Sequence, residues 1–594
     1  MKRIFLNVFL VAIFFQSCQT NAPQEQVKND MPPLETVFEE YYEERLKLFP
    51  LEATQAGDNR YNDQLPNDLT DAYQAELIEF FTRYKERLNQ YDRETLPETD
   101  KVSYDVLKWE CDISLEGQKF PMELMPIDQM SALPLVIGQL ASGESIQPFK
   151  TVKDYEDWLG RLNSFSQWCD TAIVKMKEGV RKGYVLPKVL IEKTIPQMEA
   201  FNHGPVRDHL FFKPILNFPE GFSDSDKIKL DSAYSSMIEK RIIPAYVRLH
   251  NYLKIEYLPA GRATSGISAV PKGGEMYKHL IRYYTTTDMT ADEIFRLGES
   301  EVARISSEME KVKNQVGFEG DLKAFFEHTR TRKELMPFTE PEQVIANFEE
   351  IHNRMKPHIN KLFDLIPKTP FEVRRTEAFR EASASAEYNP GSQDGSRPGI
   401  FYVPIPDVKE YNMLSDEDLF LHEAIPGHHY QISLQQENED LPKFRRTLWY
   451  SAYGEGWALY SESLGPELGL YQDPYQYFGM LSAEMHRAIR LVVDAGMHTK
   501  GWTREQAIQY SLDHEAESES GIIAEIERYM AWPGQALSYK IGQLKIIELR
   551  RRAESALGNK FDIKEFHNQV LEPGVLPIKV LEDKIDNWIA SKKA

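Results

Sequence analysis

Apolar residues recur with the period of an α-helix along most of this chain, and most clearly over residues 35–261, for example at 232–252. No Gly/Ser-rich linker or internal repeat interrupts it, and helical patterns flank every candidate boundary. The pattern predicts a mainly α-helical fold with two lobes around a cleft. We expect a single unit over 34–594, with an N-terminal lobe at 34–270 and a second lobe at 271–594.

One short region has the character of strands instead. Residues 383–388 and 399–403 flank the turn-rich stretch 389–395, which predicts a hairpin with a long loop and hence a small sheet. An exposed edge of this sheet could bind an extended peptide as an added strand, or the sheet could be covered and bind nothing. Tyr402, in the second segment, is a candidate substrate contact.

A helix with chemical side chains is predicted to follow the hairpin directly. Ser415 is a candidate cap, and Asp416, Glu417 and Asp418 suit the positive end of a helix dipole. His422 then falls in the second turn of this helix, at the start of the sequence His-Glu-Ala-Ile-Pro-Gly-His-His. This sequence resembles His-Glu-x-x-His, in which two histidines bind zinc and the glutamate activates water.

The second histidine of this motif is displaced, because Pro426 stands four residues after His422. In a straight helix His428 and His429 would lie about 9 and 10.5 Å further along the axis, too far to share one metal with His422. Pro426 and Gly427 are residues that deform a helix. A bulge of two residues would bring His428 to the metal and a bulge of three would bring His429, so both stay candidates.

A third ligand is predicted in the helical segment that precedes the stop signal Gly465-Pro466. Glu455 and Glu462 are seven residues apart and share one helix face. Two histidines and a glutamate would leave the fourth zinc position to water, as in catalytic sites. We assign Glu455 as the ligand and Glu462 as a partner that orients a ligand imidazole, although both could be ordinary surface carboxylates.

Further candidates lie on an apolar helix that ends near Gly501. Asp494 could accept a hydrogen bond from a ligand histidine, and His498 could donate one to a bound carbonyl. Alternatively, Arg490 and Asp494 form an ion pair on the helix face, and His498 merely suits the negative end of the helix dipole.

The last candidates flank a predicted helix break at 532–534. Arg528 could bind the C-terminal carboxylate of a peptide, or form a salt bridge with Glu525. Gln535 is a candidate substrate contact, and a phenol at Tyr539 could donate to a developing oxyanion.

Together, His-Glu-Ala-Ile-Pro-Gly-His-His-Tyr-Gln and Glu-Gly-Trp-Ala-Leu-Tyr-Ser-Glu resemble the bacterial domain-of-unknown-function family 885, with distant similarity to the gluzincin metallopeptidases. The resemblance runs through most of the mature chain. It implies a helical metallopeptidase-like fold, close to the thermostable carboxypeptidase and thimet-oligopeptidase groups, with a downstream tyrosine that supports the transition state. Tyr539-Lys540-Ile541-Gly542 is similar to the Tyr-x-x-Gly element of those carboxypeptidases.

These assignments predict a zinc-dependent hydrolase that cleaves peptide bonds, of carboxypeptidase or oligopeptidase type. One Zn²⁺ per chain is expected on His422, His428 and Glu455, with Glu423 as general base. Two alternatives are a zinc amidase acting on cell-wall or small-molecule amides, and a non-catalytic lipoprotein that binds peptides.

The start of the chain predicts export. Lys2-Arg3 and the apolar run 4–15 lead to Ser17-Cys18, which indicates a signal peptide over 1–18 with a lipobox-like end. Phe15 departs from the usual small residue of a lipobox, so a secreted soluble form is the alternative to a lipid anchor on Cys18. Residues 19–33 would form a tether. A lipid anchor would place the protein in the cell envelope.

The net charge argues against one class of partner, and the cysteine content limits the number of disulfides. A net charge of −22 argues against nucleic acid as a partner, because phosphates would be repelled. Cys111 and Cys169, the cysteines beyond Cys18, are expected to be buried as small apolar residues rather than paired, although one disulfide is compatible with export.

Overall fold

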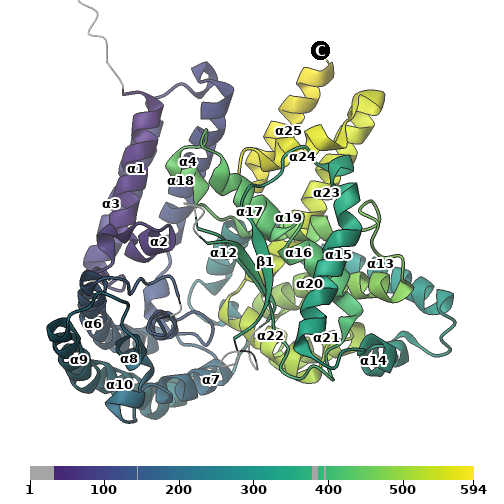
Figure 1. Ribbon diagram of the computed structural model, residues 1–594. Coiled ribbons are helices and arrows are strands. Elements are labelled where there is room, and N and C mark those ends of the chain that lie inside the picture. The colour runs from purple at the N-terminus through teal and green to yellow at the C-terminus, as the bar shows by residue number, and fades with distance from the viewer. Residues whose placement is uncertain (1–31, 144, 378–380, 382–384, 393–396, 594) are drawn as a thin grey trace, which may run out of the picture.

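A computed structural model describes residues 32–143, 145–377, 381, 385–392 and 397–593. It confirms the predicted fold class: the chain is mainly helical, with one small sheet, and Figure 1 shows two lobes side by side. The predicted signal peptide, Cys18 and most of the predicted tether lie outside the described residues. None of the helices in the described ranges combines the length and the apolar run that a bilayer crossing needs.

The N-terminal part is a stack of helices with its own aromatic core (Figure 1). Helix α6 (Val152–Lys182) is its longest member, with a capping box at Thr151 and a left-handed Gly183 after its last residue. Cys111 and Cys169 are buried and unpaired, as expected. The other helices are α1 (Leu34–Leu48), α2 (Pro50–Gln55), α3 (Asp71–Leu88), α4 (Glu98–Gly117), α5 (Leu133–Leu140), α7 (Lys188–Glu199), α8 (Lys213–Leu216), α9 (Asp224–Met237), α10 (Ile243–Tyr252) and α11 (Leu258–Ala260).

The second part contains the larger core, to which α1, α3 and α4 also contribute. The first helices of the chain therefore pack with its C-terminal half, while the division at residue 270 stays a prediction. The helices here are α12 (Gly273–Thr285), α13 (Ala291–Gln315), α14 (Leu322–Thr331), α15 (Pro341–Leu362), α16 (Asp416–Glu423), α17 (His428–Glu437), α18 (Lys443–Arg446), α19 (Ser451–Glu462), α20 (Pro474–Thr499), α21 (Arg504–His514), α22 (Glu519–Ala531), α23 (Ser538–Leu557), α24 (Ile563–Leu571) and α25 (Ile578–Lys593).

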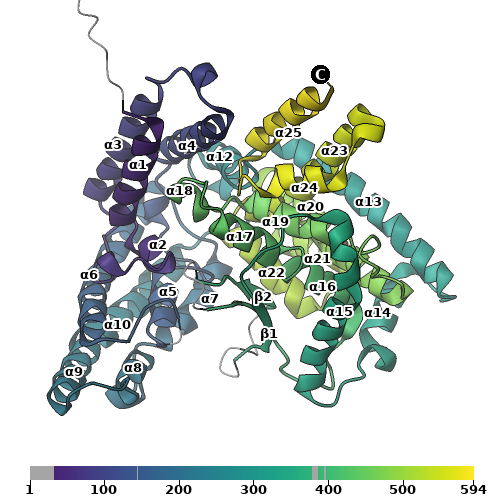
Figure 2. The ribbon, with the colours of Figure 1, turned by 45° about the horizontal axis from the view of Figure 1, so that its top comes forward.

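The sheet has the order β1-β3-β2. Strand β2 (Glu387–Asn389) pairs antiparallel with β3 (Gly399–Val403), which confirms the predicted pairing, although β2 overlaps the predicted strand 383–388 only at its end. Residues 383–384 of that prediction and 393–395 of the predicted loop lie outside the described residues. Strand β1 (Phe371–Arg375) adds a parallel strand that the sequence did not indicate. Phe401 of β3 is fully buried, with its ring 5.1 Å from that of Phe348 in α15. The sheet is therefore anchored on α15, and β2 lies at its other edge (Figure 2).

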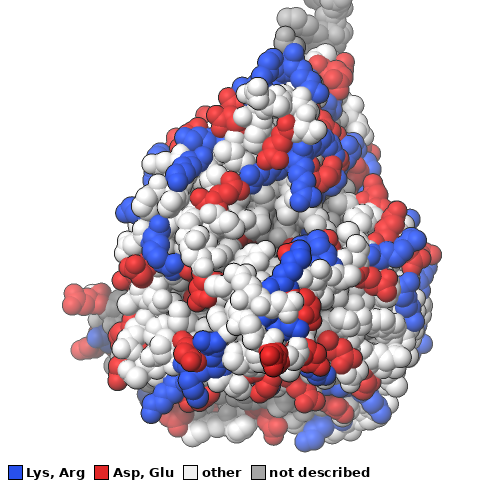
Figure 3. Space-filling model, turned by 90° about the vertical axis from the view of Figure 1, so that its right-hand side faces the viewer, with Lys and Arg blue, Asp and Glu red and all other residues white. Residues whose placement is uncertain are grey.

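Charged side chains of both signs are interspersed over the face shown in Figure 3. The excess of acidic residues is therefore not concentrated in a single-sign patch on this face.

Helices α19 and α23 cross at very short range because both have glycine at the contact. A Cβ atom on Gly456 would lie 2.5 Å from the Cα of Gly542, and a Cβ on Gly542 would lie 1.8 Å from the carbonyl oxygen of Ala452. No side chain fits there. The crossing brings the first turn of α23, with Tyr539, close to the helix that bears Glu455 and Glu462.

Replacing Gly542 with Ala should therefore lower the free energy of unfolding by about 1–3 kcal/mol, because the helices must move apart. Urea unfolding followed by circular dichroism measures this change. Gly274→Ala is the matched control, since a Cβ there meets nothing within 4 Å and should leave stability unchanged or slightly higher. Equal stability of Gly542→Ala and Gly274→Ala would contradict the close crossing.

Candidate metal centre

The His-Glu segment forms two helices rather than one deformed helix. Helix α16 ends at Glu423 and α17 begins at His428, so the predicted small bulge is replaced by a four-residue connection. Gly427 is required there by close approach, because a Cβ would lie 1.9 Å from the carbonyl oxygen of His422. Trp457 fixes the connection by donating its indole N–H to the carbonyl of Pro426 at 2.7 Å.

This connection brings the two histidines of the motif together with a glutamate. One ligand atom each from His422, His428 and Glu455 lie within 4.8 Å of one another. Glu455 Oε2 is 3.8 Å from His422 Nε2 and 3.4 Å from His428 Nε2. Ligand atoms around a tetrahedral zinc are about 3.3–3.6 Å apart, so the separation of Glu455 from His428 matches one such ion, and the other separations are longer and would shorten on a bound ion. Two imidazoles and one carboxylate also match the donor set of catalytic zinc sites.

His429 points away from this cluster, although it is adjacent to His428 in the chain. Its Nδ1 lies 2.9 Å from the hydroxyl of Tyr388 in β2, and its ring lies 4.9 Å from that of Phe371 in β1. Burial lowers the pKa of His429 to about 4, so it is a neutral residue between α17 and the sheet. Of the two alternatives that the sequence left open, only His428 faces the other candidate ligands.

Helix α19 packs against α16, and two of its carboxylates contact His422 from opposite sides of the ring. Glu455 faces its Nε2, and Glu462, two turns further on, accepts a hydrogen bond from its Nδ1 at 2.6 Å. That bond places the Nδ1 proton toward Glu462 and leaves Nε2 as the metal-binding atom. The interaction is the one predicted for Glu462.

Glu462 in turn interacts with a second buried carboxyl group, that of Asp418. Burial raises the pKa of Asp418, as does the charge of Glu462, and burial raises the pKa of Glu462 to about 7. The two carboxyl groups therefore share a proton. Tyr471 lies against both residues, and its hydroxyl donates to Oδ1 of Asp418 at 3.4 Å or to the backbone carbonyl of Glu462 at 3.0 Å. The sequence assigned Asp418 to the helix dipole alone, whereas its carboxyl group is buried and contacts the partner of a candidate ligand.

The neighbours of Asp418 in that first turn are buried as well. Asp416 accepts from Asn347 and Tyr411, and Glu417 pairs with Arg354 at 2.7 Å. Ser415 precedes the helix as predicted, but its side chain does not cap it. The acidic turn thus serves packing and ion pairing more than the helix dipole.

Glu423 is buried beside the two histidines. Burial raises its pKa to about 7, with His428 opposing this effect and Glu455 adding to it. Burial would raise the pKa of Glu455 as well, but the hydrogen bond from His428 and the positive charges of His428, His422 and Arg490 together outweigh it, and the pKa falls to about 2. The pKa values of the two carboxyl groups therefore differ: Glu455 is an anion, and Glu423 can exchange a proton near neutral pH.

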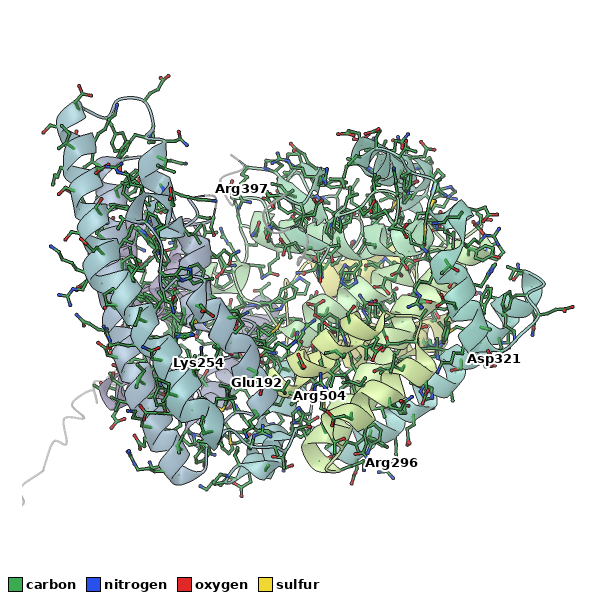
Figure 4. All side chains as sticks on the ribbon, turned by 90° about the horizontal axis from the view of Figure 1, so that it is seen from below. Glu192, Lys254, Arg296, Asp321, Arg397 and Arg504 are labelled. Atoms are coloured by element: carbon green, nitrogen blue, oxygen red, sulfur yellow. The ribbon has the colours of Figure 1, made fainter. Side chains whose placement is uncertain are left out.

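A chamber of about 1620 Å³ opens next to the cluster. Its wall includes Trp449, whose ring lies 5.8 Å from that of His428, and Gln535 from the turn before α23. Arg397, also in the wall, is labelled beside the gap between the lobes in Figure 4. The N-terminal helices close the other side, with Tyr42 and Phe49 among the lining residues. No local pattern in the sequence indicated Trp449, because its place in the wall depends on tertiary packing.

Tyr539, Arg528 and Gln535, for which the sequence predicted separate roles, lie together in one hydrogen-bonded group. Arg528 Nη2 donates to Gln535 Oε1 at 2.9 Å and to the Tyr539 hydroxyl at 3.2 Å. The predicted salt bridge between Arg528 and Glu525 is also present, at 3.1 Å.

The two candidates on α20 do not have the roles predicted for them. His498 is fully buried, with Nδ1 accepting from the backbone N–H of Ile267 and Nε2 bonded to the carbonyl of Tyr529, so no ring atom is left for a substrate. Asp494 accepts from the Tyr277 hydroxyl and the Gly534 N–H, not from a histidine. Both residues instead connect α20 to neighbouring backbone, and Arg490 pairs with Glu525 rather than with Asp494.

Tyr402 lies in β3, opposite Glu387 of β2 and Arg374 of β1. Its assignment to substrate stays a prediction.

These features define a mainly helical, two-lobed protein with a candidate metal centre beside a large chamber. The chain belongs to a family of bacterial proteins of unknown function, DUF885, whose model matches residues 50–585. No curated protein matches the chain.

Solved structures support the fold. A "putative lipoprotein" from Colwellia psychrerythraea is similar with a TM-score of 0.86 and 29% identity, over 94% of this chain and 99% of that one. A "putative lipoprotein of unknown function" from Shewanella oneidensis has a TM-score of 0.73 and 18% identity, over 93% and 99%, which shows the fold alone. A carboxypeptidase from Pyrococcus furiosus has a TM-score of 0.40 and 10% identity, over 95% of this chain and 99% of that one. This similarity is too weak to support a conclusion about function.

Glu462→Gln should weaken metal binding about 10- to 100-fold, because the amide is a poorer acceptor for the His422 Nδ1 proton. Titration with zinc against a chromogenic chelator measures the affinity. Glu467→Gln is the control, since Glu467 pairs with Arg550 at the surface. Equal affinities in the two variants would show that the hydrogen bond has no part in metal binding.

Proposed function

We propose that the protein is a zinc-dependent hydrolase that cleaves peptide bonds. The observation that carries the proposal is the convergence of His422, His428 and Glu455 beside the buried Glu423. A protein that only bound peptides would have no use for a buried glutamate whose pKa lies near neutrality beside a metal-binding group. Carboxypeptidase and oligopeptidase action are both compatible with this chemistry.

His422, His428 and Glu455 would hold the ion, and zinc when bound supplies a Lewis acid that polarises a carbonyl and acidifies a water molecule. Glu423 takes the proton of the attacking water and passes it to the leaving amine. A pKa near 7 suits both transfers, because the group is easily protonated and deprotonated at neutral pH.

Tyr539 is the proposed donor to the developing oxyanion. Its oxygen accepts from Arg528, so the phenolic proton remains available for a second hydrogen bond. A donor of this kind contributes most in the transition state, where negative charge has formed. The chamber beside Trp449 has room for several residues of a peptide chain, and its aromatic wall favours apolar side chains.

The cell envelope is the proposed location, with a lipid on Cys18 as the membrane attachment. The structure from Colwellia psychrerythraea supports the proposal, since it is described as a "putative lipoprotein", and so does the predicted signal peptide.

Glu423→Gln should reduce peptide hydrolysis by about 10²- to 10⁴-fold while the protein keeps its metal, because the amide cannot accept the proton of water. Release of amine from a set of short peptides, measured beside metal content, checks both parts. Glu439→Gln, at an exposed position after α17, is the matched control and should retain full activity. Unchanged turnover in Glu423→Gln would remove the proposed base.

A further inference from the structure

Two arginines beside the candidate metal centre share a single carboxylate. Arg490 of α20 and Arg528 of α22 both pair with Glu525, at 2.8 Å and 3.1 Å. The next carboxylate, Glu515, lies 2.5 Å from His486 Nδ1 and pairs with neither arginine, while His486 Nε2 lies 3.4 Å from Glu525 itself. Direct ion pairs therefore leave one positive charge of the two guanidinium groups without a partner.

Such an excess is costly because Arg490 is almost completely buried, with 5% of its surface exposed. Buried charges in folded proteins are normally paired, and two adjacent guanidinium groups also repel each other. Neighbouring tyrosines contribute hydrogen bonds and ring contacts, as when the Arg490 guanidinium lies 4.5 Å from the centre of the Tyr539 ring, but they carry no negative charge. The arrangement is that of a site prepared for an anion.

Unpaired N–H donors of the two arginines also indicate an anion site. Arg490 Nη1 and Arg528 Nε are buried and have no hydrogen-bond partner among the described residues. A guanidinium group offers two parallel N–H donors, which match the two oxygens of a carboxylate. Leaving buried charged donors unsatisfied costs free energy that such a ligand would recover.

The arginine pair has links to both the chamber and the helices that carry the candidate ligands. Arg528 is bonded to Gln535, which lines the chamber. On the other side, α20 packs against α16, and Arg490 is among the charges that act on His422 and Glu455. A peptide whose end reached the arginines would thus have its last peptide bonds near the metal-binding group.

We propose that Arg490 and Arg528 bind the terminal carboxylate of a peptide, which makes the enzyme a carboxypeptidase. This inference rests on the proposed peptide hydrolysis and chooses between the two types of cleavage that the metal centre alone allows. Arg528, the more accessible of the two, makes the direct contact, and Arg490 supplies charge from behind the Tyr539 ring.

The test compares an N-acylated tripeptide of apolar residues as the free acid and as the C-terminal amide. The wild-type protein with zinc should cleave the acid with a kcat/KM about 10- to 100-fold above that of the amide. In Arg528→Gln this ratio should fall at least about tenfold, and Arg528→Lys, which keeps the charge but not the two parallel donors, should be intermediate. Arg551→Gln, on the exposed face of α23, should keep the wild-type ratio. Circular dichroism and metal content verify that each variant is folded.

Binding distinguishes failure of this inference from failure of the proposed function. If the wild-type protein cleaves neither peptide, calorimetry with Glu423→Gln still measures whether the acid binds more tightly than the amide. Equal cleavage, or equal binding where nothing is cleaved, overturns the carboxylate site. An amide with a glutamate as its last residue is the third probe, and binding as tight as that of the free acid would show a side-chain carboxylate site instead.

Discussion

The candidate site depends on the two contacts that helix α19 makes with the imidazole of His422. Glu455 and Glu462 are two turns apart on α19, and His422 stands between them, with its Nε2 toward one carboxylate and its Nδ1 bonded to the other. A carboxylate that accepts from one ring nitrogen fixes the tautomer and makes the other nitrogen the better metal ligand. The proton shared by Glu462 and Asp418 lets a buried carboxyl group do this without a second full charge.

Other parts of the fold bring further candidate residues to these contacts. The break between α16 and α17 turns His428 back toward Glu455, which a continuous helix could not do. The glycine contact between α19 and α23 brings Tyr539 close to the same helix. The N-terminal helices close the chamber from the other side, so that a substrate would enter between two lobes that also share part of a hydrophobic core (Figure 4).

Much of this could be predicted from the sequence because the relevant signals are local. Helix periodicity, the hairpin at β2 and β3, and the spacing of Glu455 and Glu462 each depend on neighbouring residues, and the structure contains all three. The choice between His428 and His429 could not be made, since it depends on the path of residues 424–427, which Trp457 and the backbone of α16 determine.

Long-range contacts account for the predictions that were wrong. His498 and Asp494 lie at the expected helical spacing, but their partners, Ile267 and Tyr277, come from a segment more than two hundred residues away. The same is true of the parallel strand β1 and of Trp449 against His428, neither of which has a local pattern. Spacing identifies residues on a common face, whereas tertiary packing decides what that face meets.

Metal content of the purified mature protein tests the central claim most directly. Mass spectrometry of metals should find about one zinc per chain, as expected for a site with three protein ligands. The ion should be lost in His422→Ala, His428→Ala and Glu455→Ala and retained in His429→Ala, which faces Tyr388. A well-folded wild-type protein that takes up no zinc when zinc is added, or a metal lost with His429 and kept with His428, would contradict this account.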